Sequence, residues 1–310
     1  MRVLVTGATG FIGQHVCGAL SSTKHDIWAT SSAGPDRGSH LTSSLPVHRY
    51  TMGGHLPVDL IGWEPEAVLH LAWEGIPDLG PEICNKNVYD QLRFLEQVCD
   101  LPSVRKVVAA GSCREYGDVH GSCTESLTVE TADVFGSAKD EIRLSLKASS
   151  ADSGIDVIWL RIFFAYGPGQ RLGGLIPSLI NSLTRGEQVH LGSPDSAHDF
   201  IHVDDVANAF VCALEQPATA GIFNVGSGLP TAVADVASLV TSTWSGDGPI
   251  DYPGTMPNGV TASTGMWADL TQTSQFLGWR PQIDLVTGIA DTVRWFARRL
   301  EQDRNAGSDP

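Results

Sequence analysis

Three glycines near the start of the chain are spaced for binding a phosphate group. Gly7, Gly10 and Gly13 recur every three residues in TGATGFIG, between an apolar run and the start of an amphipathic segment. In a strand–turn–helix unit the first glycine permits a sharp turn, the second lets the backbone approach a pyrophosphate, and the third lets the helix pack close to the strand. The N–H groups and positive dipole end of that helix favour a bound anion. The segment therefore predicts a dinucleotide site that includes Phe11 and Ile12.

The residues after the second apolar run favour a cofactor with a 2′-phosphate. An acidic residue at this point would bind the ribose 2′-hydroxyl and favour NAD. The sequence has Ser31 and Ser32 there, and Arg37 follows. Two hydroxyls and an arginine suit a phosphate, so we expect NADP, with NAD as the alternative. The competing interpretation of Arg37 is a solvated loop charge.

Short apolar runs alternate with longer amphipathic segments through the first half of the chain. Such alternation predicts a parallel sheet covered by helices on both faces, the doubly wound α/β fold of the Rossmann type. The expected strands cover residues 3–6, 27–30, 47–50, 67–71, 106–110 and 156–161, and the expected helices cover residues 11–20, 83–99 and 135–147.

The pattern is looser after residue 164. We expect helices over 175–184, 203–214 and 232–241, a strand over 222–225 and a Gly-, Pro- and Thr-rich loop over 245–265. The predicted organisation is a dinucleotide-binding domain of residues 1–163, completed by 199–224. Residues 164–198 and 225–300 would form a small C-terminal substrate-binding cap, and the polar residues 301–310 a disordered tail.

Composition excludes several classes of partner. The chain has 310 residues, with 20 basic and 35 acidic side chains and a formal net charge of -15. This charge disfavours nucleic acid and anionic membranes. The six cysteines form no CxxC pair, so no metal site is expected. No signal peptide precedes the first strand and no apolar stretch reaches the roughly 20 residues that span a bilayer, so we expect a cytoplasmic protein.

An ordered set of motifs resembles the extended short-chain dehydrogenase/reductase family, which includes nucleotide-sugar epimerases, dehydratases and 4-ketoreductases. The resemblance covers nearly the whole chain. The segment HLAWEGIPD followed by GSCREYG is most similar to sugar-nucleotide 4-ketoreductases. The motifs, in chain order, are TGATGFIG, HLAW, AAGSCREYG, FGSAK, RIFFAYGPG, DFIHVDDVA, FNVGSG and LGWRP.

The resemblance implies roles for several residues. Ser112 would hold the substrate oxygen, and Lys139 would hold the nicotinamide ribose and lower the pKa of a tyrosine one helical turn before it. Phe135 occupies that tyrosine position. The family pattern also places Leu71, Ala72 and Asn87 at the cofactor.

Phenylalanine has no proton to give, and general acid–base catalysis typically contributes 10²–10⁴-fold. Three interpretations of Phe135 follow: an engineered Tyr→Phe form that traps a complex, an enzyme with another acid, or a protein that binds without turnover. Cys113 is a candidate acid if Arg114 lowers its pKa, although a buried cysteine is usually core. Glu115 is the other candidate, unless it simply pairs with Arg114. Family dehydratases have an acid pair where Cys113 and Arg114 stand, so dehydration is disfavoured.

The substrate-binding residues also depart from the family pattern. His198 stands where the family commonly has an arginine that grips the sugar diphosphate. Arg171 and Arg185 could substitute, or they are surface charges and the substrate has no diphosphate. Trp73 is expected at the mouth of the cleft, and Arg114 is a further substrate-binding candidate.

These observations predict an NAD(P)-dependent oxidoreductase, a ketoreductase or epimerase of deoxysugar biosynthesis acting on a (deoxy)sugar nucleotide. One alternative is an enzyme on a non-nucleotide substrate, favoured by the missing arginine. The other is a redox-silent cofactor-binding protein, favoured by Phe135. The resemblance also suggests a homodimer formed through residues 83–100 and 135–150.

Overall fold

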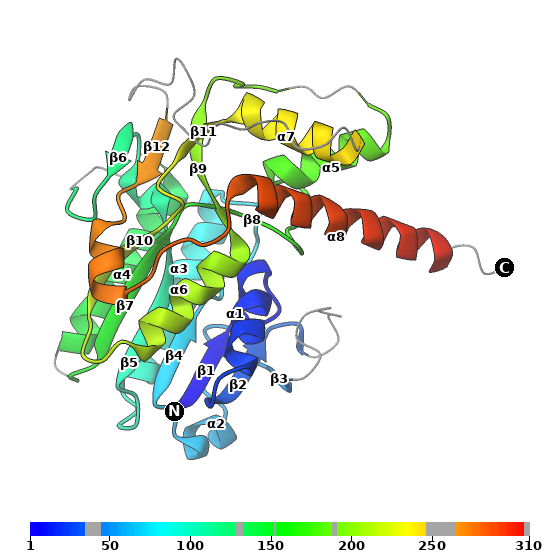
Figure 1. The fold of residues 1–310 in the computed structure, drawn as a ribbon. Helices are drawn as coiled ribbons and strands as arrows, with labels where there is room; N and C mark the ends of the chain where they lie inside the picture. Colours follow the sequence, from blue (N-terminus) through cyan, green and yellow to red (C-terminus); the bar gives the residue numbers. More distant parts are fainter. Residues whose placement is uncertain (35–44, 128–132, 152, 188–190, 246–264, 307–310) are drawn as a thin grey trace.

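The computed structural model describes residues 1–34, 45–127, 133–151, 153–187, 191–245 and 265–306. Its main sheet has seven parallel strands in the order β10-β7-β5-β4-β1-β2-β3 (Figure 1). The order reverses between β1 and β4, where an open α/β sheet leaves a crevice for ligands. The strands are β1 (Arg2–Thr6), β2 (Asp26–Ser31), β3 (Val47–Arg49), β4 (Ala67–His70), β5 (Lys106–Ser112), β7 (Asp156–Ile162) and β10 (Gly221–Val225).

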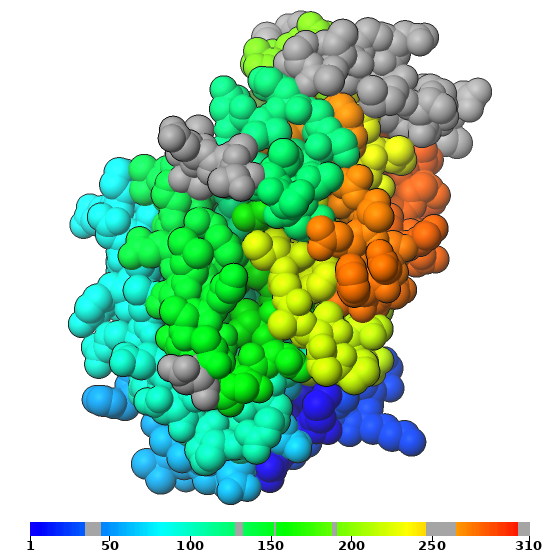
Figure 2. Space-filling view, turned by 90° about the vertical axis from the view of Figure 1, so that its left-hand side faces the viewer, coloured from blue at the N-terminus to red at the C-terminus, as the bar shows by residue number. Residues whose placement is uncertain are grey.

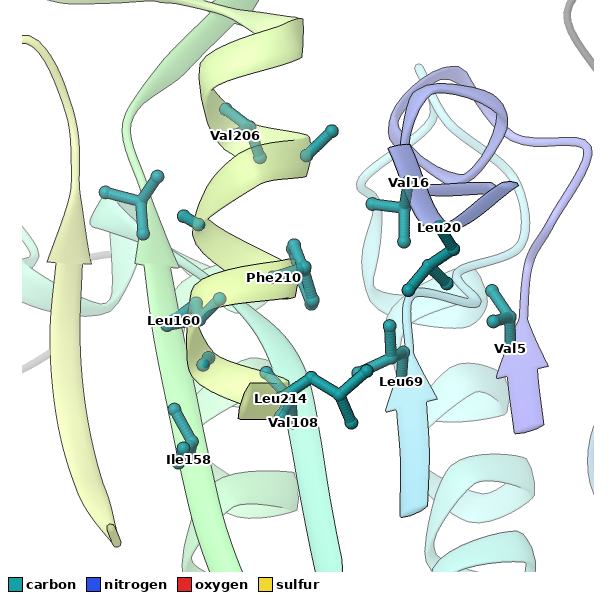
Figure 3. Close-up of a cluster of buried hydrophobic side chains, with 14 of the residues drawn as sticks. Val5, Val16, Leu20, Leu69, Val108, Ile158, Leu160, Val206, Phe210 and Leu214 are labelled. Carbon is teal, nitrogen blue, oxygen red and sulfur yellow. The ribbon is translucent and has the colours of Figure 1, made fainter. Parts of the chain in front are cut away.

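Helices cover both faces of this sheet, which confirms the predicted doubly wound fold. Successive strand residues point to opposite faces, so Val3 and Val5 join one buried cluster while Leu4 joins the other. The first cluster includes α1 (Phe11–Ser21) and α6 (Val203–Glu215), and the second includes α2 (Val58–Trp63), α3 (Pro81–Cys99) and α4 (Val134–Ala151). Figure 3 shows the first cluster, in which Val16, Leu20, Val206, Phe210 and Leu214 of the helices face Val5, Leu69, Val108, Ile158 and Leu160 of the strands.

A smaller sheet and three helices form the cap. The sheet has the strand order β11-β9-β12-β6, and β8 pairs with β9. In Figure 2 the teal segment around β6 lies against the orange segment around β12, as their parallel pairing requires. The elements are β6 (Gly121–Cys123), β8 (Phe164–Tyr166), β9 (Ala197–His202), β11 (Pro230–Ala232) and β12 (Gly265–Ala268), with α5 (Leu175–Thr184), α7 (Val233–Ser245) and α8 (Leu285–Ala306).

The start of α6 is tied to both parts of the molecule. Asp204 Oδ1 lies 2.5 Å from His15 Nδ1 on α1, and the other ring nitrogen of His15 lies 2.8 Å from the carbonyl oxygen of Pro168. The neighbouring carboxylate, Asp205, accepts hydrogen bonds from the backbone N–H groups of residues 282 and 283 at 3.0 and 2.9 Å. Two adjacent acids thus fasten one helix turn to α1 and to the segment that leads into α8.

The structure differs from the sequence expectations mainly in the cap. The five short strands of the second sheet, α2 and α8 were not expected. The helix α8 continues through Ala306, so residues 301–306 are not the predicted disordered tail, and residues 307–310 lie outside the described ranges. The expected loop over 245–265 falls almost entirely outside them too, and the domain boundaries stay a prediction. None of the helices in the described ranges has the length and apolar character to cross a membrane.

Candidate active site

The glycine turn has the geometry of a phosphate cradle. Gly7 has φ of +71°, and a Cβ there would lie 2.8 Å from the backbone nitrogen of Ala72 after β4. A Cβ on Gly13 would lie 2.1 Å from the Gly7 carbonyl oxygen. Both positions therefore require glycine. No side chain caps α1 at Gly10, which leaves the N–H groups of its first turn for a ligand.

A cleft of about 570 Å³ opens from this turn at the carboxyl ends of β1, β2 and β4. It contains most of the residues predicted to bind the cofactor, while Phe11, Ile12 and Gly13 form the first turn of α1 behind it. The cradle without side chains and the uncapped helix end fit a dinucleotide pyrophosphate. The described residues that line the cleft are Gly7, Thr9, Gly10, 30–33, 50–52, 71–76, Asn87, Asp90 and Arg171.

A chain of hydrogen bonds fixes one wall of the cleft. The Asn87 amide accepts from Glu74 N and donates to Glu74 O, both at 2.9 Å. Gln91 connects Asn87 to His70 Nε2, and His70 Nδ1 lies 2.8 Å from Thr6 Oγ1. Burial lowers the pKa of His70 to about 4, so the ring is neutral at pH 7. Asn87 therefore holds the segment after β4 in place.

Ser112 ends β5 and caps a 3-10 turn, η2 (Cys113–Tyr116). Its Oγ accepts a hydrogen bond from Arg114 N at 3.2 Å, and its backbone N–H donates to Glu115 Oε1 at 2.7 Å. Because the hydroxyl oxygen is the acceptor in this cap, its O–H can donate to another group. The local structure thus leaves Ser112 able to donate a hydrogen bond to a substrate oxygen.

Glu115 is fully buried and forms an ion pair with a strand residue. Its Oε2 accepts from Arg161 Nε at 2.9 Å, and Trp159 Nε1 lies 2.9 and 3.0 Å from its two oxygens. The alternative that Glu115 pairs with Arg114 is wrong, because Arg114 Nε donates to Asp133 Oδ2 at 2.9 Å. The surroundings of Glu115 are those of a positioning group, with both oxygens occupied by protein donors.

Cys113 lies in a buried cluster with Tyr116 and Cys123. Burial raises the pKa of its thiol, and the nearby Asp199 carboxylate raises it further. A role for Cys113 as an acid or base requires that its thiol pKa be lowered. In the structure the thiol pKa is raised, which is the opposite of what that role requires.

Phe135 and Lys139 lie on the buried side of α4, beside η2. A Cβ on Gly136 would lie 2.3 Å from the Arg114 carbonyl oxygen, so glycine lets the first turn of α4 touch η2. The Trp73 ring meets Phe135 edge to face at 4.9 Å between centroids, and Lys139 Nζ lies 4.4 Å from the Trp73 ring centroid. Lys139 Nζ also donates to the carbonyl oxygen of Ala110 at 2.8 Å. Burial lowers the pKa of Lys139 to about 8.

The structure separates the substrate-binding candidates. Arg171 is exposed and lines the cleft. Arg185 follows α5, lies 3.8 Å from Glu187 and is not among the described cleft residues. His198 packs 4.2 Å from Phe164 between ring centroids, and burial lowers the pKa of its imidazole. Arg37 lies outside the described residues.

Two positioning features were missed in the sequence. Gly136 is visible inside FGSAK, but its need for glycine follows from contact with η2, 22 residues away. The partners of Glu115 lie 44 and 46 residues along the chain, and no local signal marks them.

Comparison with known proteins decides the family. Residues 3–226 match the NAD dependent epimerase/dehydratase family. The chain belongs to this family. The resemblance drawn from the ordered motifs is thereby confirmed, and members of the epimerase/dehydratase family are NAD-dependent enzymes.

Similar proteins in the epimerase/dehydratase family act on nucleotide sugars. A UDP-glucose 4-epimerase from Mycolicibacterium smegmatis is 28% identical over 322 residues, covering 97% of this chain and 100% of that protein. A dTDP-4-dehydro-6-deoxyglucose reductase from Escherichia coli is 26% identical over 239 residues, covering 74% of each. The solved structure of MoeE5 in complex with UDP-glucuronic acid and NAD is 30% identical, with a TM-score of 0.81 over 96% of this chain and 100% of that one.

Glu115→Gln should reduce the free energy of unfolding by about 3 kcal/mol, because it leaves the buried Arg161 charge without its carboxylate. The exposed Glu141→Gln on α4 is the matched control and should change little. Guanidinium unfolding at pH 7 measures both. A Glu115→Gln protein that keeps wild-type stability but loses all turnover would instead identify Glu115 as the catalytic acid.

Lys139→Met should show a pH-dependent difference in stability from the wild type. The pKa of Lys139 falls from 10.5 to about 8 on folding. Between pH 8 and 10.5 the unfolded chain therefore holds a proton that the folded chain has released, and wild-type stability rises with pH in this window. Relative to Lys139→Met, the wild type should gain about 2 kcal/mol between pH 7 and 9.5. The exposed Lys147→Met should show no such gain; an equal gain in both variants would contradict the buried pKa.

Proposed function

We propose that the chain is an NADP(H)-dependent ketoreductase or epimerase acting on a deoxysugar nucleotide. The observation that carries the proposal is the continuity of the cleft. It runs from the glycine turn past Ser31 and Ser32 to Trp73 and Arg171. Trp73 in turn contacts Phe135 and Lys139. The cleft thus leads from a phosphate cradle to Trp73, and through the contacts of Trp73 to two of the residues that the family places at the reacting carbon, which are not themselves among the lining residues.

The proposed cofactor contacts follow from this path. The glycine turn and the start of α1 would hold the pyrophosphate, the hydroxyls of Ser31 and Ser32 the adenosine ribose end, and Lys139 the nicotinamide ribose. The bound cofactor would supply hydride transfer at nicotinamide C4. NAD is the alternative cofactor, and MoeE5, one of the solved relatives, forms a complex with NAD.

The protein's own groups would position the substrate oxygen and stabilise charge on it. Ser112 donates a hydrogen bond to that oxygen, because its Oγ already accepts from Arg114 N. Lys139 brings a buried ammonium 5.9 Å from the Phe135 ring centroid. The ring edge that would carry a tyrosine hydroxyl bears only hydrogen. This observation favours a second candidate, a redox-silent protein that binds cofactor and sugar without turnover.

Arg171 is the proposed contact for the sugar diphosphate. It lines the cleft, whereas Arg185 lies beside Glu187 away from the described lining. The named relatives act on or bind UDP- and dTDP-sugars. The alternative of a non-nucleotide substrate rests on His198, which stands in place of an arginine and whose pKa is lowered by burial.

We also propose that the protein is a cytoplasmic homodimer formed through α3 and α4. Tyr89 on α3 and Leu144 on α4 are 62% and 52% exposed. The Arg93 guanidinium lies 5.7 Å from the Tyr89 ring centroid. Large apolar side chains exposed on neighbouring helices suit an interface between copies.

Phe135→Tyr should raise turnover by about 10²-fold or more, the usual scale of general acid–base catalysis. The change adds one hydroxyl, and Lys139 lies one turn further along α4 to stabilise a phenolate. Steady-state oxidation of NADPH with 4-keto-deoxysugar nucleotides, and interconversion of UDP-sugars, measure the effect. The buried Phe163→Tyr in the neighbouring cluster is the control and should not raise turnover.

Two results would redirect this conclusion. A wild-type chain that is already active, and that loses activity in Glu115→Gln or Cys113→Ala without unfolding, has another acid. A wild type and a Phe135→Tyr variant that both bind NADPH yet turn over none of these substrates would favour the redox-silent protein.

Arg171→Gln should weaken binding of UDP-sugars by about tenfold or more, the scale of a hydrogen bond to a charged group. Arg185→Gln removes the same charge from a residue outside the described cleft lining and should have little effect. Calorimetric titration with UDP-glucose, UDP-glucuronic acid and a dTDP-sugar compares the two. Unchanged affinity in Arg171→Gln would indicate a substrate without a diphosphate at this position.

A further inference from the structure

An arginine on β3 lies beside the adenosine end of the cleft. Strands β2 and β3 are parallel neighbours, and their register pairs Ser31 with Arg49. The Arg49 guanidinium donates from Nη2 to the carbonyl oxygen of Ala33 at 3.3 Å. Ser31, Ser32 and Ala33 line the cleft. The strand pairing and this hydrogen bond together hold the guanidinium against the wall where the second strand ends.

The geometry of the turn after β2 supports this placement. Gly34 has φ of +66°, and a Cβ there would lie 3.2 Å from Arg49 Nε. The chain therefore turns closely over the guanidinium. Beside it, Thr9 Oγ1 of the glycine turn lies 2.6 Å from Ser31 Oγ, so the phosphate cradle and the end of β2 are joined.

Within the described ranges, the Arg49 side chain makes one hydrogen bond, to the carbonyl oxygen of Ala33, and Arg49 forms no ion pair. A guanidinium has five N–H donors in a planar fork that matches phosphate oxygens. No acid follows β2 at residues 32–34, the place where a carboxylate would accept a ribose 2′-hydroxyl. In a chain with a net charge of -15, a second phosphate group needs a local cation of this kind.

We propose that Arg49 recognises the 2′-phosphate of NADP(H), with the hydroxyls of Ser31 and Ser32 as additional donors. The proposal rests on the proposed function, because it assumes that the cleft binds a nicotinamide dinucleotide. Under this proposal the preference for NADP(H) depends on Arg49, whose backbone is fixed by the pairing of β2 and β3, and not on Arg37.

The test compares cofactor affinities of the full chain and its Arg49→Gln variant by calorimetry. Arg49→Gln should weaken NADPH binding by about 10- to 100-fold and change NADH binding less than about twofold, because only NADPH carries the 2′-phosphate. Adenosine 2′,5′-bisphosphate should lose its ability to compete with NADPH in the variant, whereas ADP should compete as before. Arg49→Lys, which keeps the charge but not the fork, should fall between the two.

Two matched variants control for net charge and for the competing arginine. Arg105→Gln removes the same charge at the residue before β5, at the amino end of that strand and away from the carboxyl ends where the cleft opens, and should leave both affinities unchanged. Arg37→Gln should also leave the preference for NADPH unchanged.

A selective loss of NADPH affinity in Arg37→Gln with none in Arg49→Gln would overturn the assignment, and so would an equal loss of NADPH and NADH affinity in Arg49→Gln. A wild type that prefers NADH would overturn the 2′-phosphate site while leaving the proposed dinucleotide site intact. Binding of neither cofactor would refute the proposed function itself.

Discussion

The buried ion pair between Glu115 and Arg161 is the interaction on which the active-site geometry depends. Removing two charges from water is costly, and hydrogen bonds to the carboxylate offset part of that cost, although Arg161 Nη1 is buried without a hydrogen-bond partner among the described residues. Here one carboxylate accepts donors from the end of β5, from Trp159 and from Arg161 on β7. The same arginine lies 4.4 Å from the centroid of the Tyr116 ring, so η2 is held from both of its ends. The backbone of Ser112 is therefore tied to β7 through the Glu115 carboxylate.

This constraint extends beyond the main sheet. The Tyr116 hydroxyl donates to Asn224 Oδ1 at 2.7 Å, and the Asn224 amide donates to the carbonyl oxygen of Cys123 on β6. The polar network thus runs from β5 through β10 to the first strand of the cap. Lys139 is buried next to the Trp73 ring. The tyrosine that the family pattern places one turn before this lysine is Phe135 here. In the proposed site the positioning contacts are present, whereas Phe135 has no proton to donate.

The sequence predicted what depends on neighbouring residues and missed what depends on distant ones. Gly13 was predictable because its contact with Gly7 lies within the turn, and Gly7 because its positive φ belongs to the turn itself, although its other close contact, Ala72, is distant in the chain. The strand β9 was not expected from the motif DFIHVDDVA; its buried Asp199 carboxylate accepts hydrogen bonds from the backbone of Ser227, Gly228 and Ala268, which lie far along the chain. Arg171 and Arg185 look alike in sequence, as two arginines near the ends of α5, and only the tertiary fold places one of them in the cleft. The helix α8 was missed although its apolar residues recur at helical spacing, and its partners on α5 and α7 come from separate segments.

The start of α6 has a mechanical consequence. Asp204 holds α1 through His15, whose ring also binds the Pro168 carbonyl, and Asp205 holds the segment leading to α8. A hinge between the cap and the sheet would have this helix turn as its pivot, because both sides are fastened to it. The loop that follows Pro168 is fastened on the α1 side of the pivot, and three residues later it carries Arg171. The position of Arg171 relative to the glycine turn is therefore set through His15, by the same helix turn that holds the segment leading to α8.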